Sequence, residues 1–160
     1  MVFDFFKKKD RDAVLTACVG GTVVPMDQIP DAVFSQGIMG VCCGIEPEDG
    51  RIYAPADGTV IQLTPTLHAI GLSIGDMEIL IHAGIDTVAM DGEGFTNQVR
   101  EGQTVKQGDL LMTMDLEKVH AAGYPATVIT IVTNSDDFSS VSTEAGGTVR
   151  AGDPLMRVRK

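Results

Sequence analysis

The chemically most informative residue of the sequence is a histidine at the end of an apolar run. Residues 78–88 read EILIHAGIDTV, so His82 closes a strand-like segment and is followed at once by a bend that contains Gly84. Such an imidazole could be a structural group, with both ring nitrogens bonded to the backbone. It could instead be held through one nitrogen, which would leave the other free for chemistry. The rest of the sequence has to decide between these interpretations.

A second histidine is expected beside the first. His68 starts another strand-like run after a proline bend. If residues 69–74 and 77–82 form a hairpin, His68 and His82 lie at its open end, about 5 Å apart. The two rings could be a metal pair, an acid/base pair, or a nucleophile with an assisting neighbour. The third histidine, His120, lies in a segment of helical pattern and is expected at the surface.

Several kinds of chemistry lack the residues that they need. The sequence contains no Gly-x-Ser-x-Gly motif and no P-loop, so it favours neither a serine hydrolase nor an ATP-using enzyme. Catalytic zinc takes three protein ligands, of which His68 and His82 supply two. A nucleophilic histidine needs only one nitrogen held as N–H and room for a phosphoryl group at the other. Imidazole, with a pKa of about 6.5, is largely neutral in the cytosol, and its phosphoramidate can pass the group on.

The elements that would position these residues are mainly strands. From about residue 19, runs rich in Val, Ile and Thr alternate with Asp-Gly and Gly-Gly turns. This pattern predicts an all-β fold, an antiparallel β-sandwich or barrel. One or two short helices are expected, over residues 116–122 and 31–34. Residues 102–112 (GQTVKQGDLLM) and 146–156 (GGTVRAGDPLM) match in register, which predicts two equivalent turn-and-strand corners.

The length of the chain predicts a single domain with a flexible arm before it. We expect residues 1–18 to form the arm and residues 19–160 the domain, since 160 residues suffice for one sizeable core. The first 11 residues place three phenylalanines before four basic residues. They could be a solvated terminus or could make weak contact with an anionic membrane surface.

Composition narrows the environment and the partners. A formal charge of −10 argues against nucleic acid as a partner and suits a partner with a basic face. Three cysteines, of which Cys42 and Cys43 are adjacent, suggest reduced thiols in a cytosol. No apolar stretch approaches the roughly 18 residues of a membrane span. The expected location is therefore cytoplasmic, with possible peripheral contact at the inner face of the membrane.

Two segments resemble a different class of domain. APADGTV (54–60) and EGQTVKQGDLL (101–111) are similar to motifs of biotinyl and lipoyl carrier domains. Those domains modify a lysine in a following hairpin, where this chain has Met-Thr-Met-Asp (112–115). The missing lysine disfavours a carrier of that kind.

A wider set of motifs resembles one family closely. These are VFSQGIMG (33–40), IYAPADGTV (52–60), T-x-HAIGL (66–72) and ILIHAGIDTV-x-x-x-GEGF (79–95). In this order and spacing they are similar to the glucose-type enzyme IIA of the bacterial phosphoenolpyruvate-dependent sugar phosphotransferase system. The resemblance covers about residues 22–158 and implies a β-sandwich with Greek-key and jelly-roll features.

The resemblance implies a phosphoryl carrier without an ATP site of its own. His82 would accept phosphate on Nε2 from the small histidine phosphocarrier protein and pass it to a cysteine of a IIB domain of a sugar permease. A backbone carbonyl at the Gly84 bend would hold Nδ1–H. His68, oriented by Thr66, would hydrogen-bond the phosphoryl oxygens.

The resemblance also implies a docking surface and leaves other functions open. Asp86 would pair with a basic residue of the phosphocarrier, and Phe34, Ile38 and Met39 would supply apolar contact. Where the family has Asn or Asp and then Gly after Met-Gly, this chain has Val41 and Cys42. The protein could alternatively be a regulator that docks transporters or kinases according to its phosphorylation state. It could also bind a metal: no cofactor is required, but zinc could bind His68 and His82 with a partner's ligand.

Overall fold

The computed structural model describes residues 12–160, whose regular secondary structure consists mainly of strands. Every strand pair is antiparallel, as predicted. The strands form one large sheet, in the order β13-β2-β3-β11-β7-β6-β5-β9, and two small ones, β1-β14-β12 and β4-β10-β8. Their bounds are β1 Asp12–Thr16, β2 Gly21–Val24, β3 Val41–Pro47, β4 Arg51–Tyr53, β5 Gly58–Leu63, β6 Ala69–Ile74, β7 Met77–Ala83, β8 Phe95–Asn97, β9 Thr104–Val105, β10 Leu110–Met114, β11 Val128–Val132, β12 Ser140–Thr143, β13 Thr148–Val149 and β14 Pro154–Arg159.

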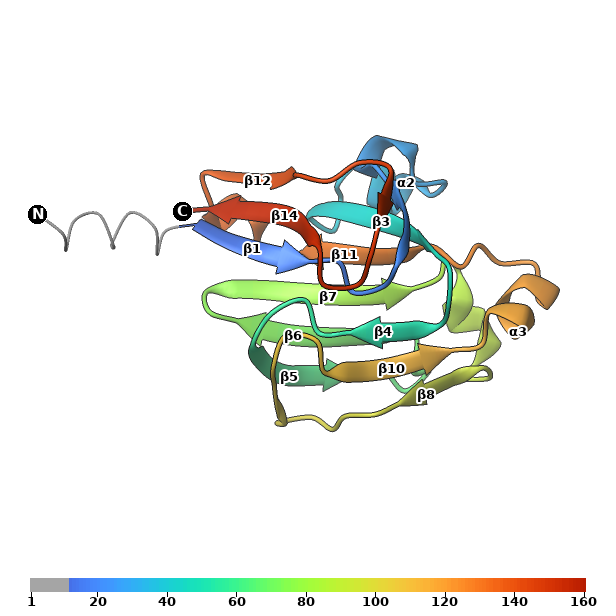
Figure 1. Ribbon diagram of the computed structural model, residues 1–160. Coiled ribbons are helices and arrows are strands. Elements are labelled where there is room, and N and C mark those ends of the chain that lie inside the picture. Colours follow the sequence, from blue (N-terminus) through green and yellow to red (C-terminus); the bar gives the residue numbers. More distant parts are fainter. Residues whose placement is uncertain (1–11) are drawn as a thin grey trace, which may run out of the picture.

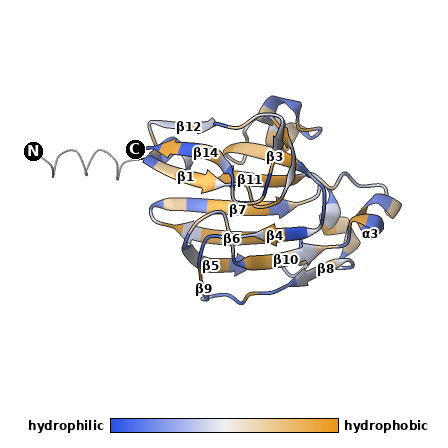
Figure 2. Cartoon of the chain, viewed as in Figure 1, coloured by the Kyte–Doolittle hydropathy of each residue, from blue (hydrophilic) through white to orange (hydrophobic). Residues whose placement is uncertain are grey.

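The large sheet and the small sheets make a sandwich. Figure 1 shows β1, β14, β4 and β10 in front of the large sheet. The main core lies between the layers, because its buried side chains come from both, such as Leu15 and Leu111 from the small sheets and Ile79 from the large one. Figure 2 shows hydrophobic colour along β1, β3 and β7. The predicted all-β sandwich is confirmed. Strands that are distant in the sequence, such as β3 and β11, are neighbours in the large sheet, so the chain crosses over between them.

Within residues 12–160, two α-helices and three 3-10 helices connect the strands. The two predicted helices are both present, and each has an aspartate at its N-cap that accepts a backbone N–H. Among residues 12–160, no helix has both the length and the apolar character that a membrane span requires. The bounds of the five helices within residues 12–160 are η1 Met26–Gln28, α2 Ala32–Ser35, η2 Thr87–Met90, α3 Leu116–Ala121 and η3 Ser135–Asp137.

The structure corrects the expected boundary of the N-terminal arm. Residues 12–16 form β1, which pairs with β14 from Asp12 opposite Arg159 onward, and Leu15 is fully buried. Residues 12–18 therefore belong to the domain. The sequence missed this because a strand's partner at the other end of the chain leaves no local signal. The proposed membrane contact concerns residues 1–11, which lie outside the described residues.

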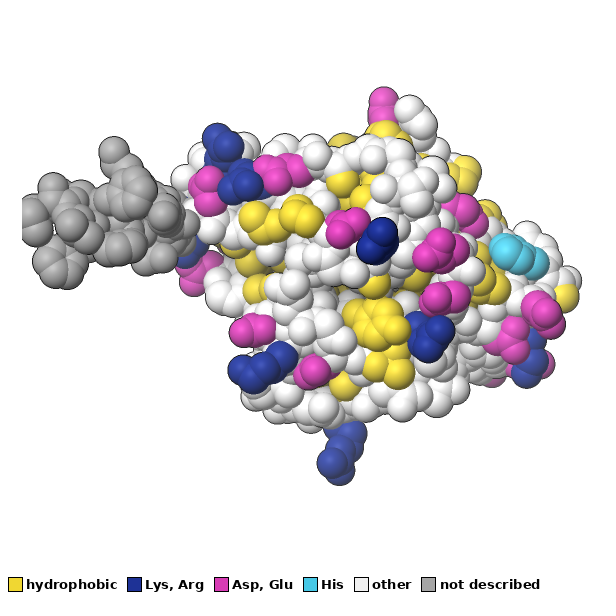
Figure 3. All heavy atoms as spheres, viewed as in Figure 1, with side chains coloured by type: hydrophobic (Ala, Val, Ile, Leu, Met, Phe, Trp, Pro, Cys, Tyr) yellow, Lys and Arg dark blue, Asp and Glu magenta, His cyan; other side chains and the backbone are white. Residues whose placement is uncertain are grey.

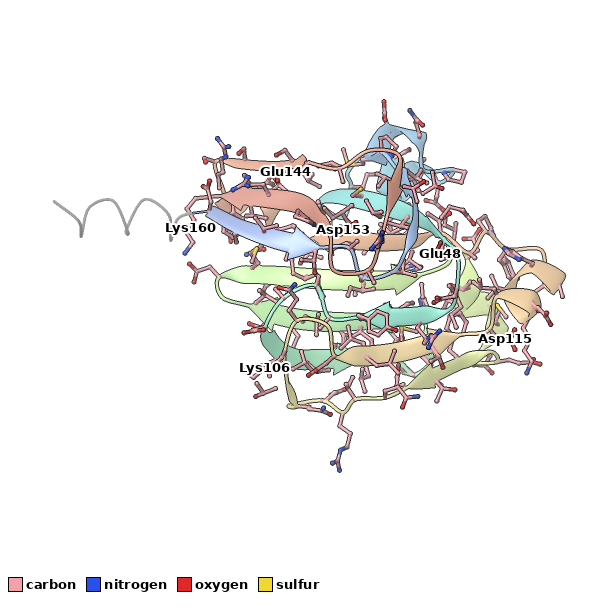
Figure 4. The ribbon with its side chains drawn as sticks, in the orientation of Figure 1. Glu48, Lys106, Asp115, Glu144, Asp153 and Lys160 are labelled. Carbon is pink, nitrogen blue, oxygen red and sulfur yellow. The ribbon has the colours of Figure 1, made fainter. Side chains whose placement is uncertain are left out.

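The two matching segments do form equivalent corners. In one, Lys106 N–H donates to the carboxylate of Asp109 at 2.8 Å, and in the other Arg150 N–H donates to that of Asp153 at the same distance. Figure 4 labels one residue from each corner, Lys106 and Asp153. Both corners lie ahead of a strand of a small sheet, β10 or β14.

The outer face of the large sheet carries the site. Along β7 the side chains alternate, so that Ile79 and Ile81 point into the core while Leu80 and His82 point outward. Helices η1 and α2 cover part of this outer face. A second, smaller apolar cluster fills the space beneath them: Ile29, Phe34, Cys42, Ile85, Ile129 and Ile131.

Candidate functional site

His82 occupies a central position of the large sheet. It lies next to last on β7, opposite Ala69 of β6 on one side and Ile129 of β11 on the other. Strands on both sides fix the backbone of His82. The ring is half-buried on the outer face of the sheet.

The bend after β7 holds one nitrogen of the His82 ring. Gly84 has φ of +79° and turns its carbonyl back to within 2.7 Å of Nδ1 of His82. A Cβ at Gly84 would collide with Cγ2 of Thr87 and lie 3.1 Å from the carbonyl oxygen of Pro125. A carbonyl can only accept a hydrogen bond, so Nδ1 carries the proton. In the neutral ring, Nε2 is therefore left with its lone pair.

His68 lies beside His82, as the predicted hairpin requires. The ring centroids are 4.8 Å apart, and the rings meet nearly edge to face at 79°. The N–H of Ala83 donates to the His68 carbonyl at 2.8 Å, which ties the two backbones together. Oγ1 of Thr66 lies 2.7 Å from Nδ1 of His68. Because a hydroxyl can donate to Nδ1, this contact is compatible with a proton on Nε2 of His68.

Burial keeps both rings neutral at physiological pH. Desolvation, and secondarily the neighbouring His82, lower the pKa of His68 to about 4. Desolvation also lowers the pKa of His82, and the Gly84 carbonyl, Asp31 and Asp86 oppose this shift. A neutral His82 has a free lone pair, which is the form that a nucleophile needs.

An aromatic side chain forms one wall of the site. The ring of Phe34, on α2, is centred 5.1 Å from that of His82 and tilted by 58°. Phe34 is only 6% exposed, so little of it is available to a docking partner. Of the other residues expected to dock, Ile38 is exposed and Met39 is half-buried. Their role in docking stays a prediction.

Two exposed apolar residues were missed by the sequence analysis. Val33 is 43% and Val88 53% exposed, compared with 67% for Ile38. Val33 precedes Phe34 on α2, and Val88 lies on η2, two residues after Asp86. The opposite side of the molecule, which Figure 3 shows, has charged side chains of both signs scattered around its hydrophobic ones.

The acidic residues and the cysteine near the site differ in exposure. Asp86 is exposed at the N-cap of η2 with φ of +62°, and Asp31 caps α2. Cys42 is buried, and its thiol donates to the Phe34 carbonyl at 3.4 Å. Burial raises its pKa to about 12, so it stays protonated. His120 is exposed on α3, as expected.

The donor set for a metal is incomplete. Within residues 12–160, no group of three or more His, Cys, Asp or Glu side chains could hold a metal ion. His68 and His82 are two ligands of the right kind for zinc, which takes at least three from protein. A zinc ion at this place would need a ligand from another protein.

Comparison with known proteins identifies the family. Residues 13–138 match the family model described as the phosphoenolpyruvate-dependent sugar phosphotransferase system, EIIA 1. The chain belongs to this family. The phosphotransferase-system function predicted from the sequence is thereby confirmed, as is the suspected resemblance to glucose-type EIIA proteins.

Individual relatives agree with the family match. The "PTS system glucose-specific EIIA component" of Bacillus anthracis is 39% identical over 94% of this chain and 92% of its own length. The solved structure "Glucose permease IIA from Mycoplasma capricolum" has a TM-score of 0.81 and 30% identity, and the match covers 91% of this chain and 95% of that one.

Some relatives are much longer proteins. The "PTS system beta-glucoside-specific EIIBCA component" of Dickeya chrysanthemi is 47% identical over 92% of this chain. The chain spans only 24% of that relative's length.

Proposed function

We propose that this EIIA chain accepts a phosphoryl group on Nε2 of His82. The donor would be the phosphorylated histidine of the small phosphocarrier protein, and the acceptor a cysteine of a IIB domain of a sugar permease. The observation that carries the proposal is the 2.7 Å contact between Nδ1 of His82 and the Gly84 carbonyl. It leaves Nε2 as the nucleophilic atom of the pair.

Each transfer is a displacement at phosphorus. In the first, the Nε2 lone pair forms a bond to phosphorus while the bond to the donor's nitrogen breaks, and that nitrogen keeps the electron pair. The His82 ring retains its proton on Nδ1 and takes up positive charge, which the Gly84 carbonyl stabilises. In the second, the cysteine thiolate attacks phosphorus, and His82 leaves as neutral imidazole. A neutral leaving group keeps the phosphoryl group transferable.

His68, oriented by Thr66, would donate a hydrogen bond to the phosphoryl group during transfer. If the Thr66 hydroxyl donates to Nδ1 of His68, then Nε2 of His68 carries a proton that can point to a phosphoryl oxygen. Phosphoryl transfer has a loose transition state with charge on the equatorial oxygens, so fixed donors and positioning provide most of the catalysis.

The surface around His82 suits protein partners. Val33, Ile38 and Val88 offer exposed apolar contact near two carboxylates, Asp31 and Asp86. An apolar centre with acidic residues at its rim fits a partner whose own apolar surface is rimmed by basic residues. We infer that donor and acceptor dock here in turn, because both must reach the same Nε2.

The acceptor and the location follow from the same proposal. The longer relative is named an EIIBCA component, which supports a IIB domain of a sugar permease as the acceptor of this chain as well. Cysteines 18, 42 and 43 are all free and buried, which fits a reducing cytoplasm. Contact of residues 1–11 with the inner face of the membrane remains part of this proposal.

A reconstitution tests the proposed function directly. The protein is incubated with labelled phosphoenolpyruvate, the general enzyme I and the phosphocarrier, and the label on the protein is followed in acid and in base. We expect a base-stable, acid-labile label, as a phosphoramidate requires, which a IIB domain then removes. A protein that stays unlabelled with an active donor would overturn the proposal.

A further inference from the structure

One residue next to the histidine pair has an unusual backbone conformation. Three residues other than glycine have positive φ within residues 12–160: Leu67 at 63°, Asp86 at 62° and Asp91 at 54°. Aspartate tolerates the left-handed region because its short polar side chain can bond locally. Leucine has no such compensation, so the surrounding structure must impose this conformation on Leu67.

The strained residue lies in a tightly closed loop. Leu67 N–H donates to the Thr64 carbonyl at 2.9 Å. The Thr64 hydroxyl lies 3.2 Å from both the N–H and the carbonyl of Ala69, where β6 begins. The loop thus starts and ends at the same pair of residues and presents Thr66, Leu67 and His68 between them.

The left-handed turn explains how Thr66 reaches His68. In an extended chain, residues two apart lie on the same face but about 7 Å from one another. Here the Thr66 hydroxyl lies 2.7 Å from Nδ1 of His68. A left-handed residue between them folds the chain enough to close this gap, and Leu67 is that residue.

Packing of the Leu67 side chain holds the conformation. Leu67 is half-buried and packs against the main core. A Cβ at Gly92 would lie 3.5 Å from Cδ1 of Leu67, so the Gly92 backbone runs directly beside this side chain. Gly92 opens the GEGF segment, to which the proposed function assigns no chemistry. Its φ of +85° lies in the left-handed region, which glycine adopts without strain.

We propose that Leu67 is a positioning residue for phosphoryl transfer. Its left-handed backbone, held by packing beside Gly92, places the Thr66 hydroxyl on Nδ1 of His68 and thereby fixes the ring with its Nε2 proton toward the phosphoryl group. The last step rests on the proposed function of His68. The placement of the ring does not, because it is a property of the unphosphorylated protein.

Two substitutions separate backbone conformation from side-chain character. Leu67→Val keeps an apolar side chain, but a β-branched residue strongly disfavours positive φ. Leu67→Asn loses the apolar packing but adopts the left-handed region readily. Leu116→Val is the matched control, since it removes the same methylene from another half-buried leucine that packs against the same core, on helix α3.

The first readout is the tautomer of His68 in unphosphorylated protein, from the ring ¹⁵N chemical shifts. We expect one dominant tautomer with protonated Nε2 in the wild type, in Leu67→Asn and in Leu116→Val, and an averaged signal in Leu67→Val. Should Leu67→Val not fold, Leu67→Ala, which removes the packing beside Gly92, is expected to show the averaging instead. Wild-type ring shifts in every folded Leu67 variant would overturn the proposal.

The second readout is single-turnover transfer from His82 to a IIB domain. Loss of one net hydrogen bond corresponds to about a tenfold lower rate for Leu67→Val and for Thr66→Ala alike. We expect the double variant to be no slower than either single one, because both act through one contact. A hundredfold loss in the double variant would overturn the proposal, since Leu67 would then act independently of Thr66. Averaged ring shifts with unchanged transfer would instead overturn the proposed role of His68 and leave its placement by Leu67 standing.

Discussion

His82 lies on β7 and His68 immediately precedes the neighbouring strand β6, yet their Nδ1 atoms contact groups of different kinds. At His82 the partner is the Gly84 carbonyl, which only accepts hydrogen bonds, at 2.7 Å. At His68 it is the Thr66 hydroxyl, which both donates and accepts, at the same distance. The carbonyl imposes a proton on Nδ1 of His82, whereas the hydroxyl can donate to Nδ1 of His68 and so hold that ring with its proton on Nε2.

The two rings also differ in their exposure to solvent and in the charges near them. His68 is 6% exposed, and its pKa falls to about 4, while His82 is half-buried and has two aspartates near it that oppose the lowering of its pKa. An atom that must meet two partner proteins has to be reachable. A group that only assists can be buried, where its hydrogen bond is stronger. The difference in exposure therefore supports the proposal that His82 is the nucleophile and His68 the assisting group.

Removal of the nucleophile tests the comparison most severely. We expect His82→Gln to abolish phosphoryl labelling altogether. The proposed nucleophile is the Nε2 lone pair of His82, and it is lost with the ring. His120→Gln is the matched control, since His120 is exposed on α3 and should leave labelling at the wild-type level. Labelling that survives in His82→Gln but disappears in His68→Gln would reverse the assignment of the two rings.

Removal of the assistant should affect the two transfers unequally. In His68→Gln the amide can still donate to a phosphoryl oxygen, so His82 should still be labelled. The neutral His68 of the free protein can take up a proton once the negative phosphoryl group lies beside it, whereas Gln cannot, so we expect onward transfer to a IIB cysteine to fall by about 10²–10³. Single-turnover rates in each direction measure both steps. Equal and severe losses would indicate a joint structural or metal site, and no loss would mean that His68 only fills space.

Local sequence patterns were enough to predict much of the site. Strand patterns and turn residues predicted the β6–β7 hairpin and the pairing of His68 with His82. The carbonyl contact at Gly84 and the Thr66 contact were implied by the family resemblance, and both are present. The resemblance also supplied the proposed role of each residue, which spacing alone left open.

Long-range packing decided what the sequence could not predict. The family resemblance placed Phe34 on the docking surface, yet Phe34 is buried against Cys42 of β3 and against residues of β11 far along the chain. Val33 and Val88 are exposed for the complementary reason, that no element covers them. The strain at Leu67 comes from its packing beside Gly92, 25 residues later. None of these contacts has a periodicity that a single sequence reveals.

The bend at Gly84, which holds Nδ1 of His82, can be disrupted by a single substitution. We expect Gly84→Ala to destabilise the fold by about 2–3 kcal/mol or more, because the added Cβ meets Thr87 and requires a strained positive φ. Urea unfolding measures the change. The double variant with Thr87→Ser, which removes the colliding methyl group but keeps the hydroxyl that donates to Ala83, should recover part of the loss. No recovery would place the strain in the backbone alone.

The smallest expected effect is a pH dependence of stability that originates mainly at His68. The unfolded chain protonates this ring near its ordinary pKa of 6.5, whereas the folded protein resists protonation down to about pH 4. Between these values the unfolded state binds more protons, so the free energy of unfolding must fall as the pH falls through this window. At pH 5 the loss from His68 should be of the order of 1–2 kcal/mol.

His68→Gln removes this contribution and should show a shallower decline between pH 7.5 and pH 5 in urea unfolding. Some decline should remain, because burial also lowers the pKa of His82. His120→Gln, which changes an exposed ring, should decline as the wild type does. If His68→Gln and the wild type lost equal stability, the folded protein would accept the proton on His68 without penalty. The ring would then be partly charged before any phosphoryl group arrives, and the contrast between a neutral, buried assistant and a reachable nucleophile would no longer hold.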